Sequence, residues 1–169
     1  MAAFVNISGP IVANTAYVDN KLVARDVAAT LPEITPTTVD VQAMGTWSLP
    51  IWQLLEDMQF SITKIGIDMG LRSMLKPEPM ALEPRFVQTV TDANGATKNV
   101  GAKAFIKGIP ASIPGIGVEI GTASENECTY SVTRYQLVVD GVEMFLIDRL
   151  AGILRIGGKD YASQLTNLL

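Results

Sequence analysis

The sequence of 169 residues is long enough to form one domain, residues 1–169, with a sizeable hydrophobic core. Its formal net charge of −4 argues against a surface built to neutralise nucleic-acid phosphates. Hydrophobic residues make up 48% of the chain and charged residues only 18%, a balance that favours a protein that assembles.

The N-terminal part predicts an extended arm followed by strands. Residues 1–15 are apolar, contain a Gly-Pro interruption and show no helical or strand period, so we expect an arm without an internal packing partner. Residues 16–23 predict a tight hairpin that turns at Asp19-Asn20, because Asn tolerates left-handed backbone. Residues 25–34 continue as a predicted strand.

The next segment predicts a loop, a strand and a helix. Residues 37–50 are punctuated by Gly, Trp and Pro and predict a loop with one short strand. Apolar and polar residues alternate over 54–65, which predicts a strand, although residues 51–55 fit a helical turn equally well. Residues 68–75 carry an apolar stripe at helical spacing and predict a short peripheral helix.

A second hairpin and a long loop follow. Residues 85–91 and 100–107 flank an Asn-Gly turn signal, which predicts that they pair as antiparallel strands. The segment 109–127 is rich in Gly, Pro and small residues. It is longer than an ordinary connection, so we expect this loop to have a role of its own.

The central feature of the sequence is a third hairpin. Residues 128–139 are rich in β-branched and aromatic residues and predict a long strand, which turns at Asp140-Gly141 and returns along 142–147. Apolar residues occur on both faces of the first arm. Such a strand is either central in a packed domain or covered by a neighbouring subunit.

The chain ends with a short extended segment and a helix. Residues 154–156 precede a Gly-Gly pair, and Asp160 is expected to cap a C-terminal helix over 160–168. The predicted elements show no alternating βαβ rhythm. They indicate a mainly β fold, a β-sandwich or open β-barrel with one short peripheral helix, a short C-terminal helix, an extended N-terminal arm and long loops.

Two glycine-rich segments superficially suggest phosphate binding. Residues 115–121 (GIGVEIG) have the wrong spacing for a dinucleotide loop, and no helix obviously follows, so a flexible loop or bulge is the better interpretation. Residues 157–160 (GGKD) lack the spacing and the hydroxyl residue of a Walker motif, and they predict a turn before a helix.

No catalytic, cofactor-binding or metal-binding residue is predicted. The chain has no histidine, which removes the usual general base and metal ligand and argues against an enzyme. Glu56 and Asp57 are adjacent on a predicted strand, so their side chains should point to opposite faces. Glu119, Glu125 and Glu127 are interpreted as solvated charges. Trp47 and Trp52 are interpreted as anchors at a domain or subunit contact.

The sequence also carries expectations about location. Its single cysteine, Cys128, cannot form an internal disulfide and is expected to be an ordinary strand residue. No apolar run approaches the ~20 residues of a membrane span. The N-terminal segment lacks the charged and long apolar regions of a signal peptide. We therefore expect synthesis in a reducing cytoplasm and no direct membrane insertion.

The colinear order of five motifs resembles one family along nearly the whole chain. Each motif alone is only a hydrophobic strand beside a turn, so the order makes the match specific. The family is the major tail tube proteins of contractile-tailed bacteriophages and R-type pyocins. The motifs are ANTAYVDN at 13–20, VAATLPEI at 27–34, LLEDMQFS at 54–61, YQLVVDGVEMFLID at 135–148 and GILRIGGKDYASQL at 152–165.

The resemblance implies a structural virion protein without cofactors. Its copies would form hexameric rings that stack into the inner tail tube, and sheath contraction would drive this tube through a cell envelope. DNA would pass through the lumen without specific binding during genome ejection. The implied partners are other copies of the chain, the sheath protein, the tape-measure protein, the baseplate hub and the tail terminator.

Two alternatives stay open at this stage. The same fold could serve as the tube of a secretion system or of an extracellular contractile injection system, and the sequence chemistry does not separate these from a phage tail. The second alternative is a β-barrel ligand-binding or enzymatic domain that uses Trp47, Trp52 and nearby carboxylates.

Overall fold

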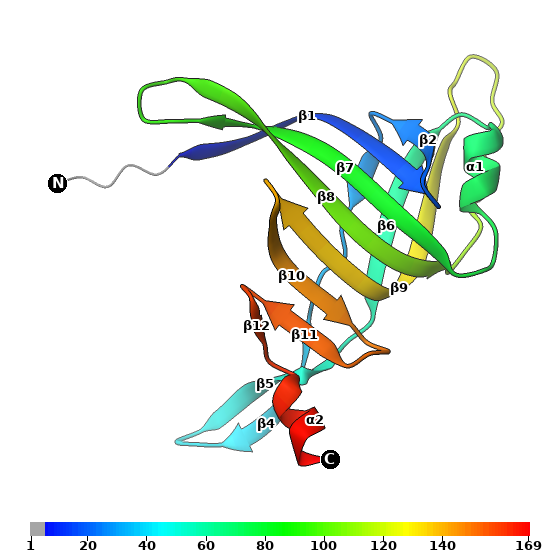
Figure 1. The fold of residues 1–169 in the computed structure, drawn as a ribbon. Coiled ribbons are helices and arrows are strands. Elements are labelled where there is room, and N and C mark those ends of the chain that lie inside the picture. Colours follow the sequence, from blue (N-terminus) through cyan, green and yellow to red (C-terminus); the bar gives the residue numbers. More distant parts are fainter. Residues whose placement is uncertain (1–5) are drawn as a thin grey trace.

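A computed structural model describes residues 6–169 and shows antiparallel strands with two short helices (Figure 1). The predicted mainly β fold is confirmed. The elements of the described chain are β1 (Ile7–Val18), β2 (Lys21–Arg25), β3 (Ala28–Thr30), β4 (Pro36–Gln42), β5 (Thr46–Leu55), β6 (Met58–Ile65), α1 (Met69–Met74), β7 (Met80–Thr91), β8 (Thr97–Pro110), β9 (Glu125–Val139), β10 (Val142–Asp148), β11 (Ile153–Ile156), β12 (Lys159–Asp160) and α2 (Ser163–Leu168).

Ten of these strands form one antiparallel sheet around β9. Along one edge β9 pairs with β8, and along the other edge it pairs first with β6 and then with β10. The sheet continues from β8 through β7 and β1 to β2, and from β10 through β11 to β12. The sheet does not close into a barrel, because its end strands β2 and β12 do not pair with each other. This agrees with the prediction of a β-sandwich or open β-barrel.

The core lies where the sheet curves so that β1 and β2 face β6. Alternate residues of β6 point inward: Met58, Phe60 and Ile62 are all buried. The Phe60 ring stacks on Tyr130 of β9 with 5.9 Å between the ring centroids. Helix α1 covers this core, and the Tyr130 hydroxyl donates a 2.8 Å hydrogen bond to the carbonyl oxygen of Met74.

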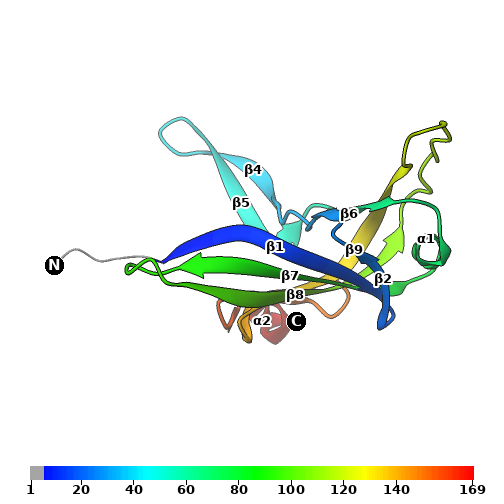
Figure 2. The ribbon, with the colours of Figure 1, turned by 90° about the horizontal axis from the view of Figure 1, so that it is seen from above.

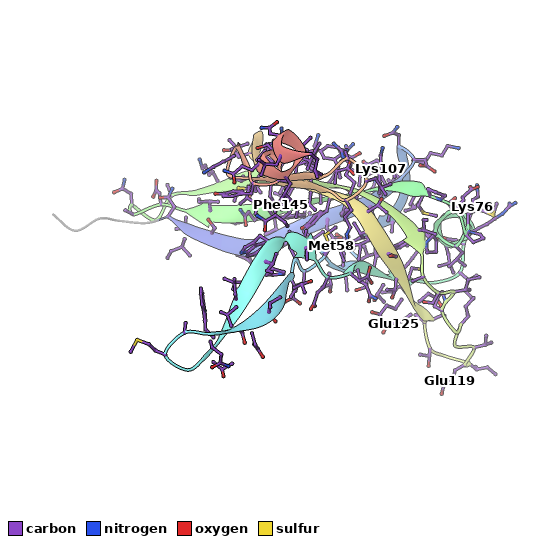
Figure 3. All side chains as sticks on the ribbon, turned by 90° about the horizontal axis from the view of Figure 1, so that it is seen from below. Met58, Lys76, Lys107, Glu119, Glu125 and Phe145 are labelled. Carbon is purple, nitrogen blue, oxygen red and sulfur yellow. The ribbon has the colours of Figure 1, made fainter. Side chains whose placement is uncertain are left out.

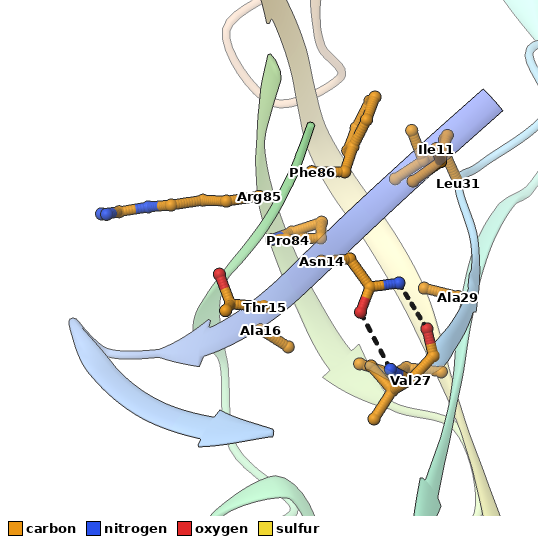
Figure 4. A pocket seen from close by; sticks show the side chains of 11 residues that line it. Ile11, Asn14, Thr15, Ala16, Val27, Ala29, Leu31, Pro84, Arg85 and Phe86 are labelled. Atoms are coloured by element: carbon orange, nitrogen blue, oxygen red, sulfur yellow. Dashed lines mark hydrogen bonds between the residues drawn. The ribbon is translucent and has the colours of Figure 1, made fainter. Parts of the chain in front are cut away.

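Side chains, rather than a ladder of backbone hydrogen bonds, join β1 and β2 to the part of the sheet that contains β3 and β6. The buried ammonium of Lys64 on β6 donates a 2.9 Å hydrogen bond to the Val23 carbonyl of β2 and pairs with Asp68 at 3.2 Å. The Asn14 amide of β1 bonds both backbone groups of Val27, donating to its carbonyl at 2.6 Å and accepting from its N–H at 2.8 Å (Figure 4). These contacts satisfy backbone groups that no neighbouring strand reaches.

We expect Asn14→Ala to lower the free energy of unfolding by about 1–3 kcal/mol, because both backbone groups of Val27 lose their partner in a partly buried place. Urea denaturation measures this loss. Asn99→Ala is the matched control, since the Asn99 side chain bonds only Thr89 at an exposed position. Equal denaturation midpoints for the two variants would contradict the bridging role of Asn14.

The predicted N-terminal arm differs from the structure. Residues 7–15 are not unpaired but lie in β1, which pairs with β7 from Ile7 opposite Thr91 onward. The Gly-Pro interruption is accommodated where the register of this pairing shifts, after Ser8. Residues 1–5 of the predicted arm lie outside the described residues. The following turn is confirmed: Asp19 and Asn20 adopt φ angles of 48° and 66°.

The expectations for residues 25–65 are also corrected. The strand expected over 25–34 is interrupted because Asp26 has a φ of 50°, and only the three residues of β3 pair with β6. The loop expected over 37–50 is instead most of the β4–β5 hairpin, and residues 51–55 continue β5 rather than forming a helical turn. The strand expected over 54–65 therefore begins only at Met58.

The C-terminal half follows the prediction with shifted boundaries. Both predicted hairpins form, around Asn94-Gly95 and around Asp140-Gly141. The loop expected over 109–127 shortens to 111–124, since β8 and β9 extend into it from both sides. The C-terminal helix begins at Ser163 and not at residue 160. Asp160 belongs to β12, where its carboxylate accepts a 2.9 Å hydrogen bond from the Ala162 N–H.

Candidate assembly surface

The β4–β5 hairpin projects from the main sheet (Figures 1 and 2). Its two strands pair only with each other and form a separate two-stranded sheet. Met44 and Gly45 at its tip have φ angles of 53° and 121°, which supply the turn. No residue of β4 or β5 is buried. The hairpin therefore gains little from the core of its own chain.

The two faces of this hairpin differ in polarity toward its tip. The cross-strand pairs Val39–Leu49 and Val41–Trp47 lie on one face, next to Ile51, and this set is called the apolar hairpin face below. The opposite face is polar and carries Asp40, the only charged residue of the hairpin, which accepts a 2.6 Å hydrogen bond from the hydroxyl of Ser48. Val39 is 45% exposed and Trp47 is 52% exposed.

An uncovered face of this kind indicates a contact with another molecule. A single two-stranded hairpin is at best marginally stable in water, and it normally needs a third strand or a packing partner. Contiguous apolar surface rimmed by polar residues marks interaction sites on soluble proteins. Tryptophan is also enriched among the residues that dominate binding energy at interfaces. The apolar hairpin face has all three properties.

The base of the hairpin is held against the main sheet. The Arg149 guanidinium, in the turn after β10, donates a hydrogen bond to the carbonyl oxygen of Leu55. Beside this bond lies a groove of about 410 Å³, whose walls include Trp52 and Leu54 of β5, Leu154 of β11 and Ala162 next to α2. This anchoring gives the projecting hairpin a defined direction.

A second exposed apolar segment lies in the loop 111–124. Its ends are fixed by hydrogen bonds of 2.8 Å, from the Ala111 N–H to Thr129 and from the Gly66 N–H to Ser124. Between them the loop exposes four apolar side chains: Ile113 at 67%, Ile116 at 40%, Val118 at 91% and Ile120 at 103%. Residues 115–121 are followed by a turn and then by β9, and not by a helix as a dinucleotide loop would be.

The other predicted candidates do not come together as a chemical site. Glu56 and Asp57 lie between β5 and β6 rather than on a strand, and they border a groove with Glu33 and Glu127. Within residues 6–169, no group of three or more His, Cys, Asp or Glu is placed to hold a metal ion. None of the helices in this same part of the chain is long and apolar enough to cross a membrane.

The remaining candidates have structural positions. The residue pair Gly157-Gly158 forms the turn between β11 and β12 with φ angles of 60° and 84°. Cys128 is buried in β9, and desolvation raises the pKa of its thiol, which keeps the thiol in its unreactive neutral form. Glu125 and Glu127 begin β9 instead of lying in a loop, whereas Glu119 does lie in the loop. The expectation that Trp47 and Trp52 anchor a contact stays a prediction.

A comparison with protein families identifies the family of the chain. The family model of phage tail tube protein FII matches residues 11–169. The chain belongs to this family. The resemblance to tail tube proteins inferred from the sequence is thereby confirmed, and the family is structural rather than enzymatic. No curated protein sequence matches this tail tube protein.

Solved structures share the fold of the tail tube protein. One similar chain comes from the sheath-tube complex of an extracellular contractile injection system, PVC, in its extended state. It has a TM-score of 0.51 and 11% sequence identity, over 79% of this chain and 91% of that one. Another comes from the sheath/tube terminator of PVC in the extended state. It has the same TM-score and identity, over 76% of this chain and 95% of that one.

Proposed function

We propose that copies of this tail tube protein assemble as stacked hexameric rings into the inner tube of a contractile tail. The tube would be the conduit for DNA, and contraction of a surrounding sheath would drive it through a cell envelope. The protein would then be part of a virion, made in the host cytoplasm. Its partners would be its own copies, the sheath protein, the tape-measure protein, the baseplate hub and the tail terminator.

The observation that carries this proposal is the family match together with the uncovered hairpin. A tube subunit must present surfaces that are completed only by other copies. The apolar hairpin face is such a surface, since Val39 and Trp47 are about half exposed although the hairpin is ordered. Closed symmetric assemblies bury surfaces of this kind, and ring closure also protects the open edges of a sheet.

The charge of the chain fits a conduit that DNA must leave quickly. A wall rich in Lys and Arg would hold phosphates through counterion release, with an affinity that depends strongly on salt. The formal net charge of −4 is consistent with a wall that lacks this attraction. We therefore expect DNA to pass through the lumen without specific binding.

A second candidate function is the tube of an extracellular contractile injection system. The two solved chains described above come from such a system, PVC, in complexes of sheath and tube. The chemistry of the subunit would be unchanged, so the two functions differ in the particle that contains the tube and not in the fold of the subunit.

Electron microscopy of the purified protein tests both candidates. We expect negative-stain images to show rings with sixfold symmetry or stacked tubes, and sedimentation velocity to show discrete large species. A protein that stays monomeric at high concentration would overturn tube assembly. In particles isolated from the producing cells, tubes attached to DNA-filled heads would favour a phage tail, and tubes in particles without heads would favour the injection system.

A further inference from the structure

We propose that the loop 111–124 of one copy packs on the apolar hairpin face of a second copy, and that this contact joins successive subunits head to tail. The inference rests on the proposed function, because it assumes that the protein assembles with itself. It goes further by naming the two surfaces that meet. Each of them is apolar and exposed, and each lacks a partner within the described part of its own chain.

The loop has a pattern that fits a flat apolar face. In the sequence Gly115-Ile-Gly-Val-Glu-Ile-Gly121, apolar side chains alternate with Gly or Glu. In extended chain, alternate residues point to the same side. Ile116, Val118 and Ile120 can therefore face a partner together while Glu119 points away from it.

The backbone of the loop also has free hydrogen-bonding groups. Over residues 112–123, the structure shows one internal backbone hydrogen bond, from the Thr122 N–H to the Glu119 carbonyl oxygen at 3.4 Å. The other backbone donors and acceptors of this stretch can be used by a partner. Polar groups at the rim of the contact can therefore bond the loop backbone while its apolar side chains pack on the hairpin face.

The two surfaces also match in charge. The apolar hairpin face carries no charged residue, because Asp40 lies on the opposite, polar face. Glu119 is the only charged residue of the loop 111–124, and the alternation places it on the side away from Val118. Packing one surface on the other therefore buries apolar area without removing a charge from water, which would be costly.

The placement of the two surfaces favours a contact between different copies. Figures 1 and 2 agree in showing the hairpin near one end of the molecule and the loop beside α1 at the other end. In Figure 3, Glu119 marks the loop, and the hairpin projects on the same side of the sheet far from it. Two different surfaces at opposite ends make a heterologous contact, and repeated heterologous contacts either close into a ring or continue as a filament.

Cysteine pairs test this contact in the full-length protein. Copies carrying Val39→Cys are mixed with copies carrying Val118→Cys, assembled and oxidised, and covalent dimers are measured on a non-reducing gel. A disulfide requires the two Cα atoms to lie within about 7 Å, so only a direct contact gives a dimer. The native Cys128 is buried and does not contribute.

The matched control is Asp40→Cys mixed with Val118→Cys, because residue 40 lies next to residue 39 but on the polar face. We expect at least about tenfold more dimer from the Val39 pair, given how sharply disulfide formation depends on geometry. A second pair, Leu49→Cys with Ile120→Cys, samples the same two surfaces and guards against a local misfit of the first pair.

The outcomes separate the inference from the proposed function. Tubes that form normally while neither apolar-face pair exceeds the Asp40 control would overturn the loop contact and leave tube assembly standing. The apolar hairpin face would then be free for another protein, such as the sheath. If the unmodified protein forms neither rings nor tubes, the proposed function fails and the inference fails with it.

Discussion

Trp47→Asp is expected to abolish tube assembly while leaving the subunit folded. Trp47 is 52% exposed in the single chain, and it takes no part in the buried core, so its loss costs the subunit little. In an assembly the same side chain would lie within the contact made by the apolar hairpin face. A carboxylate placed there would have to be buried without a partner, which costs several kcal/mol at each contact. A tube repeats this penalty in every subunit.

Negative-stain microscopy and sedimentation velocity measure the loss, and circular dichroism with urea denaturation checks the fold. Thr46→Asp is the matched control, since Thr46 precedes Trp47 on the same strand but lies on the opposite face, across from the neutral Gln42. We expect this control to assemble. Normal tubes from Trp47→Asp would show that the apolar hairpin face stays open to solvent in the assembly.

The elements that the sequence predicts well are those whose signals are local. Asp-Gly and Asn-Gly supply the positive φ angles of tight turns, and the structure places turns at both dipeptides. The helix α1 was equally predictable. Asp68 accepts a 3.0 Å hydrogen bond from the Leu71 N–H, the usual role of an aspartate before a first helical turn.

The elements that the sequence misplaces depend on distant partners. The first half of β1 has no period of its own, and it becomes a strand because β7 offers a free edge, with paired residues 77 to 84 positions later in the chain. The break at Asp26 is similar. A positive φ at a single aspartate leaves no pattern in the sequence, although it ends β2 and turns the chain toward β6.

The candidate surface was partly visible in the sequence. The sequence indicates the two tryptophans as anchors at a contact, but it predicts a loop over the segment 37–50 that contains Trp47. A period of two is present: Val39 and Val41 alternate with polar residues, and Trp47, Leu49 and Ile51 alternate with Ser48 and Pro50. Pro50 and the glycine at the tip obscured this pattern. Pro50 is tolerated because β5 has a free edge.

The core and the assembly surface are thus separate in this protein. The buried cluster consists of side chains from the main sheet and α1, and no residue of the β4–β5 hairpin belongs to its buried members. Substitutions in the core should therefore change the stability of the subunit, and substitutions on the hairpin should change assembly. This separation allows each property to be measured without disturbing the other.

High pH is expected to destabilise the isolated subunit through two buried tyrosines. Desolvation raises the pKa of Tyr135 from 10.0 to about 12, and it raises the pKa of Tyr130 as well. Above pH 10 the unfolded chain releases these protons while the folded chain retains them. The unfolded state then binds fewer protons, so the free energy of unfolding falls as the pH rises, by about 1.4 kcal/mol per pH unit for each tyrosine.

Urea denaturation between pH 8 and pH 12 measures this loss, and tyrosine variants assign it. Tyr135→Phe should remove about half of the decline, because phenylalanine has no proton to release. Adding Tyr130→Phe should remove most of the remainder. This second change also removes the 2.8 Å bond to Met74, so it should cost about 1 kcal/mol at neutral pH. An equally steep decline in the double variant would show that other groups cause the alkaline unfolding.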